Sequence, residues 1–115
     1  MLTMPPELPE PQLKPHTGIV LHKRYLRGSL DGTTPETPRD LFWRVAASIA
    51  ESERAYPASP YTPEQLAREF YDLMTSWTFL PNSPTLMNAG TELGQLSACF
   101  VLPVGDSIEE IFDAV

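Results

Sequence analysis

The chain has 115 residues, of which 13 are proline, and a formal net charge of −7 at pH 7. This length accommodates one domain at most, and the acidic balance argues against electrostatic binding to nucleic acids or to anionic membranes. No apolar run is long enough to span a bilayer, and the N-terminus lacks the pattern of a signal peptide. The single cysteine cannot form an internal disulfide, which fits a cytoplasmic location.

Residues 1–34 are predicted to form a proline-rich leader that is either extended or disordered. Five prolines within the first 15 residues remove backbone donors and favour extended chain. The apolar and basic run at residues 18–26 is interpreted as a brief strand or a docked extended segment. His16 and His22 lack the cysteine or carboxylate neighbours of a metal site, so we predict no metal ligand.

Two amphipathic helices are predicted within residues 35–80, and together they are interpreted as an N-terminal helical domain. Thr37 and Thr62 are the expected N-caps, and each is followed by a proline at the first helical position. Apolar residues recur at helical spacing in both segments. A short proline-containing linker between them favours an antiparallel helix hairpin.

Residues 81–115 are predicted to contain a loop, a strand and the start of a third helix. The turn formers in Pro81-Asn82-Ser83-Pro84-Thr85 exclude a helix or a central strand there. Residues 96–102 alternate between two largely apolar faces, which predicts a strand that is covered on both sides. Ser107 is the predicted N-cap of the helix that follows.

Two residue patterns in this region have a structural and a functional interpretation. A lone cysteine on a strand, such as Cys99, is more often a small buried hydrophobic residue than a reactive thiol. The loop at residues 81–90 is either a surface connection or a site whose hydroxyls and free amides bind a phosphate. Local sequence alone favours the structural interpretation in both cases.

Three blocks in the order PNSPTLMNAGT, LSACFVLPV and DSIEEIFDA resemble the large catalytic subunit of ribonucleotide reductases, most closely the class II, adenosylcobalamin-dependent enzymes. The resemblance extends over residues 37–115 and is most specific from Phe79 onward. It implies reduction of ribonucleotides to deoxyribonucleotides, the precursors of DNA, by thiyl-radical chemistry. It also implies a mainly α piece, in which a helical domain leads into the first strand and helix of a ten-stranded α/β barrel. The rest of that barrel is not encoded here, so this piece alone is not expected to be active.

The resemblance also implies roles for individual residues. Cys99 matches a redox-active cysteine on the first barrel strand, whose partner cysteine is absent from this chain. Ser83 and Ala98, together with Cys99, match substrate-contacting positions, and Ser83 matches a contact to the substrate phosphate. The segment that binds a deoxynucleotide effector in the dimeric enzymes matches Asp106, Ser107 and Ile108.

The implied partners are a ribonucleotide substrate, a deoxynucleotide effector, a thioredoxin-like reductant, the missing C-terminal part of the enzyme and a second copy in a homodimer. The adenosylcobalamin cofactor is expected in the full-length enzyme and not on this piece. One alternative is a class I large subunit, which uses a separate metal-containing radical subunit. Another is a non-catalytic helical interaction module. Because a single strand has no ladder partner, we expect the isolated piece to be partly folded, with the helix pair its most ordered part.

Overall fold

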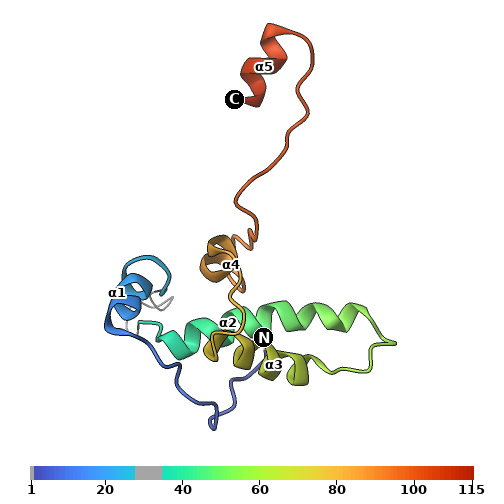
Figure 1. The fold of residues 1–115 in the computed structure, drawn as a ribbon. Coiled ribbons are helices and arrows are strands. Elements are labelled where there is room, and N and C mark those ends of the chain that lie inside the picture. Colours follow the sequence, from blue (N-terminus) through green and yellow to red (C-terminus); the bar gives the residue numbers. More distant parts are fainter. Residues whose placement is uncertain (1, 28–34) are drawn as a thin grey trace.

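The computed structural model describes residues 2–27 and 35–115, and within these residues it contains helices and no β-strand (Figure 1). The helical character predicted for this piece is thereby confirmed. In chain order the helices are α1 (Pro15–Arg24), α2 (Pro38–Glu51), the short 3₁₀ helix η1 (Ser52–Ala55), α3 (Pro63–Thr75), α4 (Ser83–Asn88) and α5 (Ile108–Ala114). No helix of the described residues is long and apolar enough to cross a membrane.

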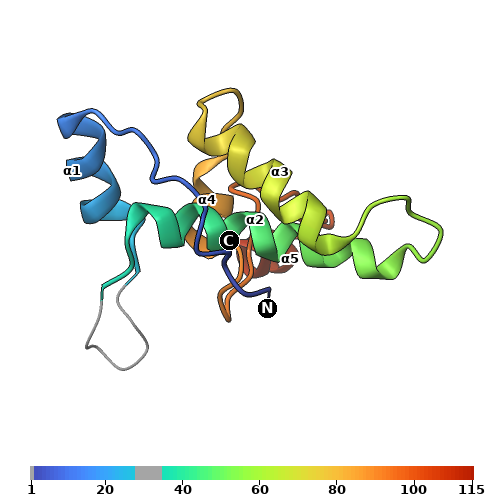
Figure 2. The same cartoon turned by 90° about the horizontal axis from the view of Figure 1, so that it is seen from below.

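A hairpin of α2 and α3 forms the centre of the molecule (Figures 1 and 2). Both predicted N-caps are confirmed, because Thr37 and Thr62 each accept a hydrogen bond from the backbone three residues ahead and complete a capping box. The two helices bury their apolar faces against each other. The largest fully buried side chains of this core are Leu41, Phe42, Val45 and Tyr71.

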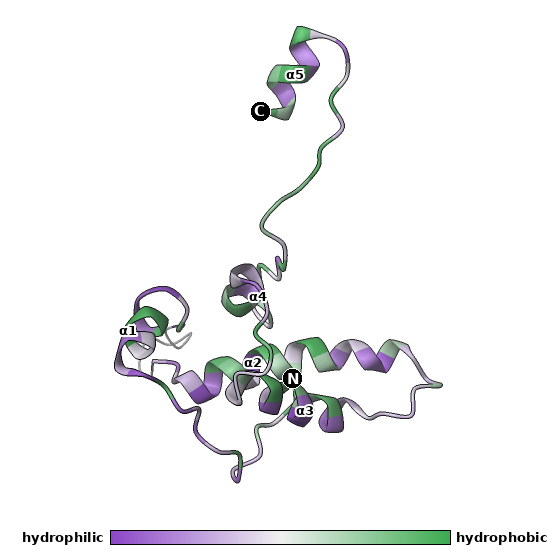
Figure 3. Ribbon diagram, in the orientation of Figure 1, coloured by the Kyte–Doolittle hydropathy of each residue, from purple (hydrophilic) through white to green (hydrophobic). Residues whose placement is uncertain are grey.

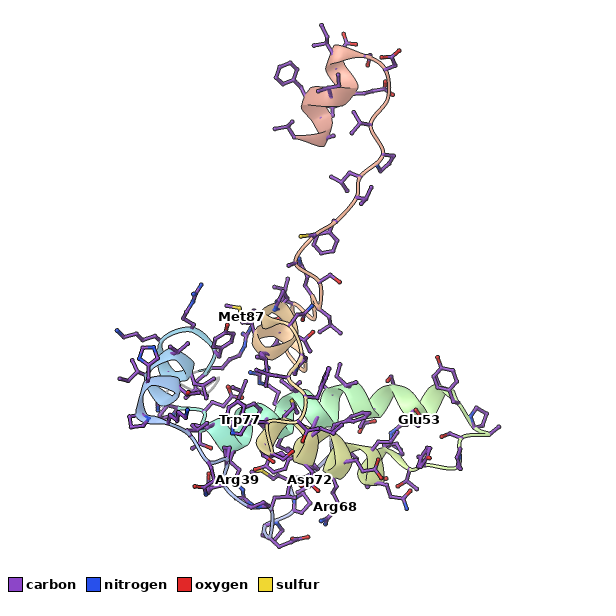
Figure 4. All side chains as sticks on the ribbon, viewed as in Figure 1. Arg39, Glu53, Arg68, Asp72, Trp77 and Met87 are labelled. Carbon is purple, nitrogen blue, oxygen red and sulfur yellow. The ribbon has the colours of Figure 1, made fainter. Side chains whose placement is uncertain are left out.

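The N-terminal arm, residues 2–13, lies along this hairpin and is fastened to it at several points. Leu8 is buried in the core cluster. The Trp43 indole donates to the Leu2 carbonyl at 3.2 Å, and the Tyr71 hydroxyl donates to the Pro9 carbonyl at 2.5 Å. Further donors on the same side are Arg39 and Trp77, and Arg68 pairs with Glu7 (Figure 4).

The helix α1 replaces the brief strand or docked extended segment predicted for residues 18–26. Pro15 occupies its first turn, where a missing amide hydrogen costs nothing, and no side-chain cap is present. Its last turn carries His22, Lys23 and Arg24, which complement the negative end of the helix dipole. These end effects outweigh the internal Gly18, which by itself disfavours a helix by about 1 kcal/mol.

The end of α3 sets the direction of the chain toward the predicted site. Trp77 adopts a left-handed conformation with φ 60°, which side-chain-bearing residues rarely adopt. Its amide donates to the Met74 carbonyl and the next amide to the Leu73 carbonyl, as in a Schellman motif. The Trp77 ring meets Phe42 edge-on, with ring centroids 6.1 Å apart, and its indole donates to the Gln12 carbonyl. These contacts offset the backbone strain.

The strand predicted at residues 96–102 does not form. The chain there is irregular and extends away from the hairpin toward α5, and α5 stands apart from the other helices in Figure 1. The reason is that a strand needs hydrogen-bonded neighbours, and the described residues supply no other strand. The run is largely apolar (Figure 3), and its side chains are exposed, with Val101 fully accessible to solvent.

Candidate functional site

The predicted substrate loop is the beginning of α4, which corrects the expectation that residues 81–85 exclude a helix. Asn82 is its N-cap, and the Asn82 Oδ1 atom accepts a hydrogen bond from the Thr85 amide at 3.0 Å. Pro84 falls in the first helical turn. A backbone N–H there would have no partner within the helix, so its absence in proline costs nothing. The prolines thus start this helix and do not interrupt it.

Ser83 is an exposed residue at the first position of α4, and its hydroxyl has one protein partner in the described structure. The hydroxyl oxygen of Tyr25 lies 2.9 Å from Ser83 Oγ, and either atom can donate. Tyr25 is the C-cap of α1, and its ring packs against the core of the hairpin. The contact therefore joins two residues that are 58 positions apart in the sequence.

Two arginines bind the carbonyl groups at the other end of α4. Arg27 Nε and Nη2 donate to the Met87 carbonyl at 3.0 and 2.8 Å (Figure 4). Arg44, from α2, donates to the Ala89 carbonyl at 2.7 Å and to the Leu86 carbonyl at 3.1 Å. The last carbonyls of a helix lack partners within the helix, and they attract cations. The guanidinium groups supply both the hydrogen-bond donors that these carbonyls lack and a positive charge.

The carboxylate of Glu36 holds both arginines in place. Arg44 Nε lies 2.7 Å from Glu36 Oε1, in an ion pair whose side chains are only 12% and 11% exposed. The other carboxylate oxygen of Glu36 accepts a hydrogen bond from the backbone amide of Arg27 at 2.8 Å. A pair with so little solvent contact is screened much less than an ion pair on the surface.

The same short helix also fixes the start of the cysteine-containing run. Asn82 Nδ2 and Thr85 Oγ1 both donate to the Leu96 carbonyl at 3.2 Å. Asn88 Nδ2 donates to the neighbouring carbonyl of Gln95 at 2.9 Å. The structure therefore brings the helix of Ser83 and the beginning of the run at residues 95–96 together. Ala98 and Cys99, a little further along, are exposed.

The predicted effector residues lie elsewhere, at the start of α5. Ser107 is the N-cap, as predicted, and it accepts a hydrogen bond from the Glu110 amide at 3.2 Å. It also donates to the carboxylate of Glu110 at 2.9 Å, so its one hydrogen is used in capping. Asp106 and Ile108 are exposed. The structure does not bring this segment to α4 (Figure 1).

The described residues contain no group of three or more histidine, cysteine or carboxylate side chains placed to hold a metal ion. An apolar cavity of about 400 Å³ lies between α2, α3 and the chain before α4, and its lining includes Ile49, Phe70 and Phe79. Its walls are almost entirely apolar, so it lacks the polar groups that would orient a nucleotide.

Sequence reasoning missed Tyr25 as a partner of Ser83, and it missed Arg27, Glu36 and Arg44 as the residues that hold the other end of α4. Local periodicity could not find them, because the contacts join residues far apart in the chain. One signal was available in Arg44, which is a charged residue within the most apolar part of a predicted helix. A cation in that position requires a specific partner.

Residues 18–94 match the model of the family described as ribonucleotide reductase, all-alpha domain. The vitamin B12-dependent ribonucleoside-diphosphate reductase of Mycobacterium tuberculosis is 44% identical over 81% of this chain and 13% of that protein. The enzyme of the same name from Thermoplasma acidophilum is 38% identical over 84% of this chain and 19% of that protein. The ribonucleoside-diphosphate reductase subunit alpha of Helicobacter pylori is 33% identical over 82% of this chain and 11% of that protein. The chain thus spans less than a fifth of the length of these relatives.

Proposed function

Because the chain belongs to the ribonucleotide reductase family, we propose that it supplies the all-alpha domain and the first substrate-contacting segment of an enzyme that reduces ribonucleotides to deoxyribonucleotides. The observation that carries this proposal is the family match over most of the helical part of the chain. The relatives named vitamin B12-dependent support a class II enzyme, since they are more similar to this chain than the subunit alpha of Helicobacter pylori. A class I enzyme with a separate radical subunit is the alternative.

The proposed reaction requires two thiols. A thiyl radical on a cysteine outside this chain removes the hydrogen at the 3′ carbon of the ribose and returns it at the end. The 2′ hydroxyl takes a proton from a pair of thiols and leaves as water. The same pair supplies the two electrons and the hydrogen that replaces the hydroxyl, and it becomes a disulfide. Cys99 is one of this pair, and its partner lies outside this chain. A thioredoxin-like reductant then restores both thiols.

Cobalamin would supply the radical-generating chemistry when it is bound to the complete enzyme. The residues described here do not fit this group. The apolar cavity described above, of about 400 Å³, is too small for a corrin ring with its nucleotide arms, and both histidines lie exposed on α1. We therefore assign no cobalamin contact to this chain. In the proposed enzyme, adenosylcobalamin is bound by residues outside it.

Ser83 and Ala98 contact the substrate in the proposed enzyme, with the Ser83 hydroxyl donating to a phosphate oxygen. Residues 96–102 become the first strand of the ten-stranded α/β barrel and bring Cys99 to the ribose. The alternation of apolar side chains in this run supports the strand, because both faces are suited to burial. The hydrogen bonds from α4 to the carbonyls of residues 95–96 support this proposal, because they hold the chain in place where the strand would begin.

The segment at the start of α5 forms part of an effector site in the same proposal. Asp106, Ser107 and Ile108 are the residues concerned, and a deoxynucleotide effector bound near a homodimer interface would select the substrate base. Asp106 accepts hydrogen bonds from a base or ribose, because its carboxylate would repel a phosphate. Replacing Asp106 by alanine in the complete enzyme should abolish nucleotide control, whereas unchanged control would leave Ser107 as a helix cap only.

The experiment that tests the function is Cys99→Ser in the complete enzyme that contains this chain. Serine keeps nearly the same shape but cannot form a disulfide, so the variant should bind nucleotide and fail to reduce it, even with a strong external dithiol. Loss of nucleotide binding together with activity would show a packing role for Cys99. Normal turnover with dithiol would overturn the assignment. Activity of the parent enzyme without cobalamin, but with a metal-containing subunit, would overturn the class II assignment.

A further inference from the structure

We propose that Tyr25 is a positioning residue for Ser83, and that Arg27 and Arg44 hold the helix that carries this serine. The all-alpha domain would then set the geometry of the contact to the substrate phosphate. This inference rests on the proposed function, because that function places Ser83 against the substrate.

The chemistry of the two hydroxyls gives the Tyr25 contact a direction. A serine hydroxyl has one hydrogen to donate and two lone pairs. A phosphate oxygen carries negative charge and only accepts, so Ser83 must donate to it. Once Ser83 donates its hydrogen to a phosphate, only the Tyr25 hydroxyl can be the donor across the 2.9 Å contact between the two oxygens. The tyrosine hydroxyl thus orients the serine without touching the substrate.

The anchoring of Tyr25 makes it suitable for this task. Its ring is partly buried against the core cluster, and its backbone amide closes the last turn of α1 on the Leu21 carbonyl at 3.0 Å. The hydroxyl is therefore presented to Ser83 from a fixed base, while Ser83 itself is exposed. A rigid support of this kind is what a precisely placed binding group needs.

The arginines fix the position of α4 as a whole. The guanidinium groups of Arg27 and Arg44 together bind three carbonyls, those of Leu86, Met87 and Ala89. Glu36 ties both residues to each other through the ion pair with Arg44 and the amide of Arg27. Because bonds to charged groups are about twice as strong as neutral ones, α4 cannot shift along its axis without losing several strong contacts.

The test is a double-mutant cycle with Tyr25→Phe and Ser83→Ala in the complete enzyme. Phenylalanine keeps the buried ring and removes only the hydroxyl. We expect Tyr25→Phe to raise the KM for the ribonucleotide about fivefold with little change in kcat, the size expected for one lost hydrogen bond. The same change made on top of Ser83→Ala should have no further effect on KM, since the group that Tyr25 orients is already absent.

The control is Tyr61→Phe, on the exposed linker between α2 and α3, which should leave KM unchanged. Circular dichroism on all variants confirms that the helices remain folded. If Ser83→Ala raises KM and Tyr25→Phe does not, the positioning role is wrong and the proposed function stands. Additive effects of the two changes on KM would also overturn it, because they would show that Tyr25 acts independently of Ser83. If Ser83→Ala leaves KM unchanged, the substrate contact in the proposed function fails first.

Discussion

Tyr71→Phe should loosen the N-terminal arm while leaving the helix hairpin intact. The Tyr71 side chain is fully buried. The substitution removes only the hydroxyl, which donates to the Pro9 carbonyl at 2.5 Å. The ring stays, and with it the packing against Trp43, whose centroid lies 6.3 Å away. Pro9 is exposed, so water can satisfy the freed carbonyl. The net cost is therefore that of one neutral hydrogen bond, ~1 kcal/mol.

A loss of this size raises the undocked population of the arm about fivefold. A glutamate-specific protease can measure it, because Glu7 precedes Leu8, which is buried when the arm is docked. Cleavage after Glu7 should accelerate about fivefold in Tyr71→Phe, since the rate follows the population of the open form. Tyr61→Phe, whose ring is exposed, is the matched control. Equal cleavage rates, or loss of the helical circular dichroism signal, would refute this reasoning.

Three further predictions concern the isolated chain. Burial raises the pKa of Tyr71 above its ordinary value of about 10. The contribution of Tyr71 to the free energy of unfolding should therefore be constant below about pH 10 and fall as pH rises above it, because the unfolded chain ionises first. Denaturant titrations of the parent chain and of Tyr71→Phe should differ in this alkaline range, since the variant lacks the contribution. Thr62→Ala, which breaks a capping box at α3, should lower the free energy of unfolding by ~1 kcal/mol, and Thr62→Ser should restore it. Cys99 is exposed, so its thiol should react with a thiol reagent equally fast with and without denaturant.

The parts of the fold that depend on local sequence were predictable. Thr37 and Thr62 begin helices because a hydroxyl and a following proline favour a helix start wherever they occur. The same rule applies to Asn82 and Pro84, yet the prediction weighed these residues as turn formers and missed α4. The helix α1 was missed because its start has no side-chain cap and its sequence includes a glycine.

The candidate site was only partly predictable, for a different physical reason. Ser83 and Cys99 were singled out by resemblance to a family, and local patterns around them had favoured a structural role. Tyr25 contacts Ser83, and Arg27 and Arg44 hold the other end of α4; all three are distant from this helix in sequence. No periodicity encodes such pairs, because each depends on how separate helices pack.

The short helix α4 is the point where two differently folded parts of the chain meet. On one side, Tyr25 and the two arginines tie it to the all-alpha domain, whose core is buried without help from residues beyond 90. On the other side, Asn82 and Asn88 tie it to residues 95–96. Beyond that point the backbone of the predicted strand is not paired within the described residues. Any sheet that forms there would start from a position already set by the helices, so in the proposed enzyme the all-alpha domain would determine where Cys99 enters the barrel.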